Sequence, residues 1–373
     1  MDAKYPSPDD NSFEQSEHGL FGSESGSDSQ SSEKVPLTRQ AGSIRSPSLP
    51  TPNPAQDVVK LAFGAGGIYA SFLYYGSLQE DVFNHVAEDG SSFKQAWFLQ
   101  VLEAAANVIV GAMGLYFSGA TKNIPQKFFV ISGASQVSSK AFTSLSLAHG
   151  LSFPVATLAK SGKMAPVMAG QLLLGGASYG IRDYMQVAAI VLGTAILSLG
   201  KKKGGESHST LVGLFFILLS LTMDGVTGGL QKRLKADMNK VGIKPKPYDF
   251  MFWTNLYMMI VAIFISFVLG EFTQGIAYCV SNADLWSLII KFSICSAIGQ
   301  SFIFYTVAHF DPLVCSTVTT TRKIFSVLLS IFTKGHQMSL QGWFGVSLAV
   351  SGILSEVHNK VSHSQKLKSK VSM

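Results

Sequence analysis

Charged residues and cysteines are both scarce in this chain of 373 residues. Only 14% of the residues are Asp, Glu, Lys or Arg, whereas soluble domains contain about 25%. The three cysteines, Cys279, Cys295 and Cys315, lack the spacing of a metal site or a disulfide framework, so they say little about the redox compartment. The low charge favours a membrane protein over a soluble domain.

Apolar residues are also scarce in the opening stretch MDAKYPSPDDNSFEQSEHG, so we expect no secretory signal peptide there. We therefore expect the first hydrophobic segment to act as an internal signal and to remain as a membrane span. The net charge of +6 does not indicate nucleic-acid binding, since the basic residues lie in loops, in the C-terminal tail and within apolar segments.

Catalytic motifs are absent from the sequence. The eight histidines are scattered, and neither HExxH nor GxSxG occurs. Glycine groups such as Gly64–Gly67 and Gly228–Gly229 follow no predicted strand, so they form neither a dinucleotide fingerprint nor a P-loop. We expect these glycines to allow close helix packing, and we expect no enzyme activity, no cofactor and no metal site.

Long hydrophobic segments dominate what the chain does contain. Hydrophobic residues make up 47% of it, with 26 Phe and 35 Gly, and Gly is more frequent in membrane helices than in soluble ones. Ten segments are long enough, or nearly so, to cross about 30 Å of hydrocarbon. They cover residues 58–78, 97–117, 127–148, 153–174, 182–200, 210–230, 250–270, 285–308, 312–333 and 340–357. The sequence therefore predicts an all-α integral membrane protein with ten transmembrane helices.

Composition divides the chain into three regions. Residues 1–56 are rich in Ser and Pro and too poor in apolar groups to fold, so we expect a disordered cytosolic tail. We expect residues 57–357 to form a domain of ten membrane-spanning helices and residues 358–373 to form a basic cytosolic tail. An even number of spans puts both termini on one side. The Lys- and Arg-rich loop 231–249 and the basic tail assign that side to the cytosol.

Two basic pairs lie deep inside apolar segments. Lys160 and Lys163 occur in the fourth segment, and Arg322 and Lys323 occur in the ninth. A cation near the bilayer centre costs at least about 2.5–3.5 kcal/mol, and such residues usually face a water-filled cavity. Because neither segment contains an acidic residue, the two pairs predict an anionic ligand. Arg322 and Lys323 diverge by about 100° on a helix, so both are not expected to face the same place.

The positions of the pairs predict two inverted five-helix repeats around a central cavity. The halves cover about 57–200 and 208–357, and an odd number of spans gives tandem halves opposite orientations. Sliding the sequence by 159 residues places Lys163 on Arg322 and Gly193 on Gly352, which is a sparse match. Equivalent helices would then present cations to one cavity from opposite sides.

Other polar residues on the apolar segments are further candidates for binding substrate. Tyr74 and Tyr75 have aromatic rings that can stack on a base or form an interfacial belt, and Gln79 follows them. Asp224 can balance the cations when no ligand is bound, or pair with Lys140. Two more polar residues, Gln300 and Asn255, can read a base or sugar, or bond between helices.

The balance of embedded charge separates two classes of transporter. A proton-coupled exporter of drugs or amines would require acidic residues in its cavity. The apolar segments instead hold more embedded cations than acids: Lys140, Lys160, Lys163, Arg322 and Lys323 against Glu103 and Asp224. That balance favours an anionic substrate, and the amine exporter remains as the alternative from another class.

Five motifs, in order, resemble a known family of membrane transporters. They are YYGSLQE at 74–80, AKSGKMAPVM at 159–168, MDGVTGGLQ at 223–231, GQSFIFYT at 299–306 and STVTTTRKIFSVLLS at 316–330. The chain resembles the nucleotide-sugar transporters of the drug/metabolite transporter superfamily, most of all the B subfamily of UDP-galactose transporter homologues. The resemblance covers residues 57–357 and implies ten helices in inverted halves around a substrate cavity.

The resemblance implies exchange of a nucleotide sugar for a nucleoside phosphate across the bilayer of the endoplasmic reticulum, with the Golgi membrane as the alternative. UDP-galactose or UDP-glucose is the first expectation. An ATP/ADP exchanger of the endoplasmic reticulum is the second, and a transporter of adenosine 3'-phosphate 5'-phosphosulfate the third. A homodimer is left open as the assembly.

Overall fold

The computed structural model describes residues 54–371 except 89, 164, 167, 169–179, 200–210, 241, 243–245, 311 and 337. Within this part of the chain the secondary structure is helical, with one isolated β-bridge between Val86 and Ser92. Residues 1–53 of the expected tail 1–56 lie outside the described residues, and residues 54–56 belong to the first helix instead of the tail. The elements are α1 Pro54–Asn84, α2 Ala96–Ser118, α3 Gln126–Ala148, α4 Phe153–Ala159, the 3-10 turn η1 Lys160–Gly162, α6 Ile181–Leu199, α7 Leu211–Lys240, α8 Pro247–Val268, α9 Glu271–Ser281, α10 Ala283–His309, α11 Pro312–Thr333 and α12 Leu340–Val371.

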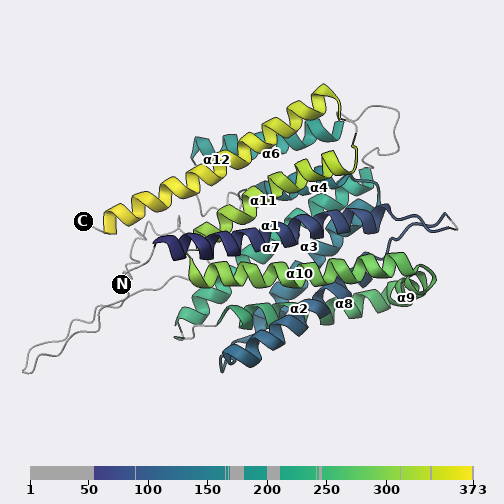
Figure 1. Ribbon diagram of the computed structural model, residues 1–373, viewed down its shortest axis with the longest axis horizontal. Helices are drawn as coiled ribbons and strands as arrows, with labels where there is room; N and C mark the ends of the chain where they lie inside the picture. Colours follow the sequence, from purple (N-terminus) through teal and green to yellow (C-terminus); the bar gives the residue numbers. More distant parts are fainter. Residues whose placement is uncertain are drawn as a thin grey trace, which may run out of the picture.

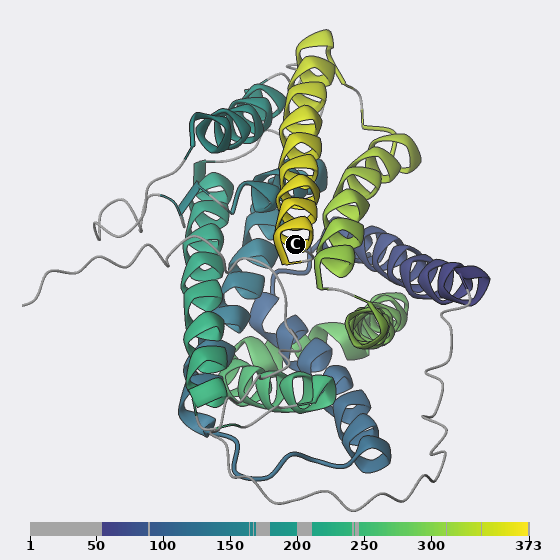
Figure 2. The same ribbon diagram turned by 90° about the vertical axis from the view of Figure 1, so that its left-hand side faces the viewer.

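The helices lie roughly side by side along one direction, with the start of α1 and the end of α12 at the same end of the molecule (Figure 1). Among the described residues, seven helices are long and apolar enough to cross a membrane: α1, α2, α6, α7, α8, α10 and α12. Seen from that end, α6 and α12 form a pair to one side of the other helices (Figure 2). The chain is therefore an all-α membrane protein.

Two further helices have the length of a span but are more polar. α3 has 23 residues and α11 has 22, which corresponds to about 33–35 Å at 1.5 Å per residue. Both carry Ser, Thr and basic residues on the face that lines the interior, including Lys140 on α3 and Arg322 on α11. Their low hydropathy therefore reflects an interior lined with polar groups.

The observed elements differ from the predicted segments in three places. The fourth segment was expected as one helix over 153–174, but α4 stops at Ala159 and continues as the turn η1, and residues 169–179 are not described. A short helix, α9, lies between the seventh and eighth segments, where none was expected. α12 continues as helix through most of the predicted basic tail and ends at Val371.

Glycine allows close contact between helices at several crossings. A Cβ on Gly67 of α1 would come within 2.3 Å of the ring of Phe302 on α10, and one on Gly193 of α6 would lie 2.5 Å from the backbone nitrogen of Ala349 on α12. The packing role predicted for Gly64–Gly67 is thus confirmed at Gly67. At Gly228 the same role is wrong, because a Cβ there would meet nothing within 4 Å.

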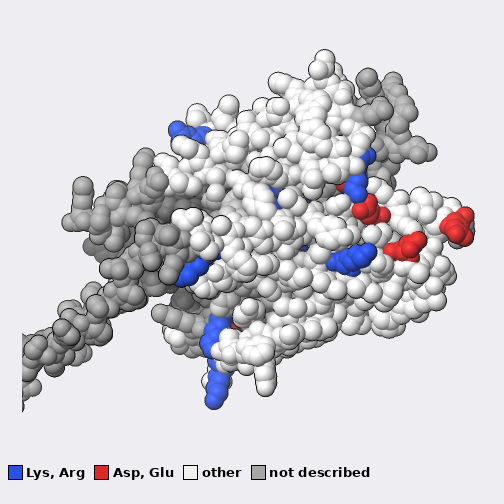
Figure 3. All heavy atoms as spheres, viewed as in Figure 1, with Lys and Arg blue, Asp and Glu red and all other residues white. Residues whose placement is uncertain are grey.

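Charged side chains gather at the ends of the molecule. On the face drawn in Figure 3, Lys, Arg, Asp and Glu lie mostly near the two ends, and the surface between them consists almost entirely of other residues. Large apolar side chains such as Phe215, Phe264 and Phe332 are 61%, 69% and 70% exposed. An apolar band between charged ends is the surface that a bilayer covers.

Candidate functional site

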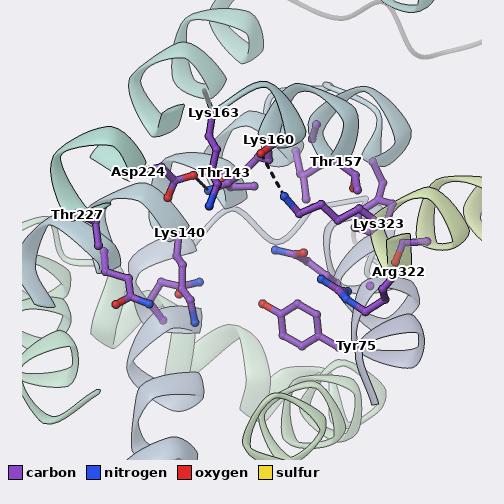
Figure 4. Close-up of a pocket in the computed structure, with 18 of the residues that line it drawn as sticks. Tyr75, Lys140, Thr143, Thr157, Lys160, Lys163, Asp224, Thr227, Arg322 and Lys323 are labelled. Atoms are coloured by element: carbon purple, nitrogen blue, oxygen red, sulfur yellow. Dashed lines mark hydrogen bonds and ion pairs between the residues drawn. The ribbon is translucent and has the colours of Figure 1, made fainter. Parts of the chain in front are cut away.

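A cavity of about 390 Å³ lies in the interior of the bundle. Its volume falls within the range of small-molecule sites, about 300–1,000 Å³. Residues of α1, α2, α3, α4, η1, α7 and α11 line it, and most of the central ones are polar. Figure 4 shows Lys163, Lys160 and Asp224 on one side of the cavity and Arg322 on the other, with Lys323 reaching across to the backbone of Lys160. The structure thus brings the two predicted basic pairs together.

Lys160 is held by a cluster of oxygen atoms from α3 and α7. Its Nζ lies 2.8 Å from Asp224 Oδ2 and donates hydrogen bonds to the hydroxyls of Ser139, Ser220 and Thr143 at 2.9, 3.1 and 3.2 Å. Because α4 ends at Ala159, the Lys160 backbone starts a tighter turn beside these helices. Asp224 thus balances one cation of the basic pairs, Lys160, whereas Lys140, its other expected partner, lies against Glu103.

Lys140 on α3 forms a second ion pair, with Glu103 on α2. Its Nζ lies 2.7 Å from Glu103 Oε1, which also accepts hydrogen bonds from Ser296 at 2.8 Å and from the hydroxyl of Tyr75 at 3.3 Å. Glu103 is only 1% exposed. A buried carboxylate requires such partners, so this network fixes α1, α2, α3 and α10 around the cavity.

Arg322 and Lys323 reach the cavity from α11 in two directions. Arg322 Nη1 donates to the backbone oxygen of Phe72 at 3.4 Å, and the guanidinium carbon lies 4.6 Å from the centre of the Phe72 ring. Lys323 Nζ instead donates to the backbone oxygen of Lys160 at 3.4 Å. Both residues line the cavity. They contact different elements, Arg322 the helix α1 and Lys323 the turn η1, as expected for adjacent residues that diverge by about 100° on a helix.

The charges of the cavity are unequally paired. Lys140 and Lys160 each contact a carboxylate. Among the described residues, no ion pair forms to Lys163, Arg322 or Lys323, although all three line the cavity. Arg322 also leaves its buried Nε without a hydrogen-bond partner. The cavity therefore presents an excess of positive charge and unused donors, which is the chemistry that binds phosphate.

The remaining predicted site residues divide into two groups. Tyr75 and Gln79 line the cavity, but one face of the Tyr75 ring stacks on Phe292 with centroids 4.4 Å apart. The described lining does not include Tyr74, which is 51% exposed, Gln300 on α10, or Asn255. Asn255 is buried and donates to the backbone oxygen of Met251 at 2.7 Å.

Several polar residues of the lining were not predicted as ligands. They are Gln100, Gln136, Lys140, Thr143, Thr157, Thr227 and Ser326. Lys140 was recognised as an embedded cation, and its spacing of four from Gln136 places both on one face of α3. The Ser and Thr residues gave no separate signal, because such side chains also bond to their own helix, as Thr143 does to Ser139 at 2.9 Å.

Comparison with known proteins assigns the chain to a family. The model of the UAA transporter family matches residues 60–360. The chain belongs to the UAA transporter family. Solute carrier family 35 member B1 of Dictyostelium discoideum is 34% identical over 316 residues, covering 82% of this chain and 78% of that protein. The Drosophila melanogaster homolog of the same carrier is 30% identical over 309 residues, covering 79% and 88%.

A third relative, UDP-galactose transporter homolog 1 of Kluyveromyces lactis, is 28% identical over 322 residues, covering 81% of this chain and 94% of that protein. Membership of this family confirms the predicted likeness to nucleotide-sugar transporters of the B subfamily. The chain is thus a multi-pass membrane transporter of the nucleotide-sugar type.

Proposed function

We propose that this transporter carries UDP-galactose or UDP-glucose into the lumen of the endoplasmic reticulum or the Golgi, in exchange for nucleotide. The observation that carries the proposal is the meeting of Lys160 and Lys163 with Arg322 and Lys323 in one cavity. The guanidinium of Arg322 can bind a phosphate with two parallel hydrogen bonds, and the lysines add point charges. A relative named as a UDP-galactose transporter homologue agrees with this substrate class.

ATP/ADP exchange is the second candidate, and the unpaired cations favour it. Lys163, Arg322 and Lys323 have no carboxylate partner among the described residues, whereas Lys140 and Lys160 do. In a nucleotide sugar the sugar esterifies the terminal phosphate and removes negative charge. A nucleoside di- or triphosphate keeps that charge and matches the excess of cations better.

We infer that residues 57–357 are ten spans arranged as two inverted halves, α1 to α6 and α7 to α12, with α9 as a short helix between spans. If the halves correspond in order, α1, α2 and α3 match α7, α8 and α10. The contact of α1 with α10 then matches the contact of α7 with α3, and the contact of α2 with α10 matches the contact of α8 with α3. All four of these helix pairs are well packed. The contacts α2 with α8, α4 with α11 and α6 with α12 map onto themselves. The packing thus follows a two-fold pattern.

Substrate exchange would then proceed by alternating access, with the halves rocking about the central cavity. The helix ends support an even number of spans with both termini on one side, because α1 starts and α12 ends at one end of the molecule (Figure 1). We assign this end to the cytosol. Basic side chains such as Arg182, at the start of α6, are then cytosolic.

Exchange in liposomes tests both candidates. The purified protein is reconstituted, and uptake of labelled UDP-galactose, UDP-glucose, ATP and a labelled amine is compared in liposomes that are empty or preloaded with UMP or ADP. The first candidate predicts sugar-nucleotide uptake accelerated by internal UMP, and the second predicts ATP uptake accelerated by internal ADP. Uptake of the amine alone would contradict both. Equal uptake into empty and preloaded liposomes would contradict exchange.

A further inference from the structure

A set of polar contacts joins the last turn of α1 to the end of α11 and the turn that follows it. Glu80 Oε1 lies 2.6 Å from His336 Nε2, and Ser330 donates to Glu80 Oε2 at 2.7 Å. Beside them, Lys334 Nζ lies 2.5 Å from Asp81 Oδ1. Two adjacent acidic residues of α1 thus hold three residues that lie more than 240 positions further along the chain.

The contacts of Glu80 are buried, which distinguishes them from an ion pair on the surface. Glu80 is 4% exposed, and Ser330 is also 4% exposed. A buried carboxylate costs free energy unless each oxygen has a partner, and His336 and Ser330 satisfy one oxygen each. As long as Glu80 is kept from water, the end of α1 must therefore stay against the end of α11.

The contacts lie directly beyond one end of the cavity. On α1, Tyr75 and Gln79 line the cavity, and Glu80 and Asp81 follow immediately. On α11, Ser326 lines the cavity, and Ser330 lies one turn beyond it. The two helices also meet nearer the start of α1, where the Tyr69 hydroxyl donates to Thr321 at 2.8 Å.

We propose that Glu80, His336 and Ser330, together with Asp81 and Lys334, form a latch that holds the cavity shut at the end where α1 and α11 finish. The orientation assigned above makes this the lumenal end. The latch must separate each time the cavity opens there, so the inference rests on the proposed transport by alternating access.

The strength of the latch is limited in two ways. The desolvation cost of the buried Glu80 offsets part of its attraction to His336, and partly exposed pairs such as Asp81–Lys334 are weak. The latch can therefore bias the closed state and still open.

A removable cross-link is the first test. Cysteines replace the partly exposed pair, Asp81→Cys and Lys334→Cys, and uptake of labelled nucleotide is measured under oxidising and reducing conditions. The latch predicts that oxidation stops uptake and that a reductant restores it. Each single cysteine variant, which carries the native cysteines as well, should be insensitive to oxidation. Full uptake by protein shown to be cross-linked would overturn the proposal.

A charge swap is the second test. Lys334→Asp alone places two carboxylates together. We expect the uptake rate to fall about tenfold, because a modest shift in the equilibrium between the closed and open states changes their ratio by about this factor. The double variant Asp81→Lys with Lys334→Asp restores the opposite charges and should recover most of the uptake. A double variant no better than the single one would show that the contact does not act as a pair.

A third measurement separates the latch from the transport proposal. Ser326→Cys, with Cys279, Cys295 and Cys315 replaced by Ala, is labelled by a charged thiol reagent applied from the lumenal side without substrate. Glu80→Gln should speed this labelling about tenfold relative to the latched protein. Faster labelling in a protein that moves no nucleotide would refute the proposed function and leave the latch standing. Unchanged labelling in a protein that does transport would refute the latch.

Discussion

The two walls of the cavity use their cations differently. On the wall formed by α2, α3 and α7, Lys140 pairs with Glu103 at 2.7 Å, which also accepts a hydrogen bond from Ser296. On the wall formed by α11, Arg322 and Lys323 donate hydrogen bonds to backbone oxygens at 3.4 Å each, and the Arg322 guanidinium lies over the Phe72 ring. Paired charges hold helices together in a membrane interior, whereas charges left without a carboxylate are available for a ligand. The same residue types thus join helices on one wall and, in the proposed site, stay available for a ligand on the other.

Removing the carboxylate of the paired wall should have the largest effect. Glu103→Leu leaves Lys140 unpaired, and breaking a buried pair costs about 3–5 kcal/mol. We expect the lower end, because the Lys140 side chain is 24% exposed. The measurement is the midpoint of thermal unfolding in detergent. The double variant Glu103→Leu with Lys140→Met removes both charges and should recover much of the loss, and no recovery would mean that the pair is not the cause.

Arg322→Ala on the unpaired wall should lower affinity with little loss of stability. A hydrogen bond to a charged group contributes about 1.5–3 kcal/mol, which corresponds to a roughly 10- to 150-fold weaker Kd for the transported nucleotide. Arg322→Lys should also bind more weakly, because a point charge cannot replace the planar fork. Binding of labelled nucleotide to purified protein gives the Kd, and an unchanged value in folded protein would contradict the assignment of this wall to the ligand.

Asp224→Asn should increase the affinity for substrate, in contrast to Arg322→Ala. Asp224 Oδ2 forms an ion pair with Lys160 Nζ at 2.8 Å, and the two side chains are 21% and 23% exposed. A partly exposed pair of this kind contributes about 0.2–1 kcal/mol, so releasing Lys160 should tighten substrate binding by a few-fold at most. The same binding assay measures it, with Asp284→Asn on α10 as the control. Weaker binding would mean that Asp224 itself contacts the substrate.

Substitutions of predicted residues that lie away from the cavity should have the smallest effect. Tyr74 is 51% exposed and Gln300 is not part of the described lining. Tyr74→Phe and Gln300→Ala should each change the free energy of binding by less than about 0.5 kcal/mol. A much larger effect on Kd would show that the cavity enlarges toward α10 when substrate binds.

The membrane class of this protein and its key cations could be read from the sequence. Long apolar segments allow few other folds, and a cation inside such a segment is costly enough to predict a cavity. Gln300 and Asn255 could not be told from the true lining, since a polar side chain on an apolar helix can equally satisfy its own backbone, as Asn255 does with Met251. The break after α4 was also missed, because the spacing of three between Lys160 and Lys163 equally fits one face of a continuous helix.

The sequence by itself determined that the chain spans a membrane, which family it belongs to and that anions are its ligands, because these follow from hydropathy, motifs and the sign of embedded charge. Only the tertiary structure decided which cations are neutralised. Lys140 meets Glu103 across 37 positions and Glu80 meets His336 across 256. Such partners are chosen by how helices pack side by side, and no local pattern of residues encodes a contact between side chains so far apart in the chain.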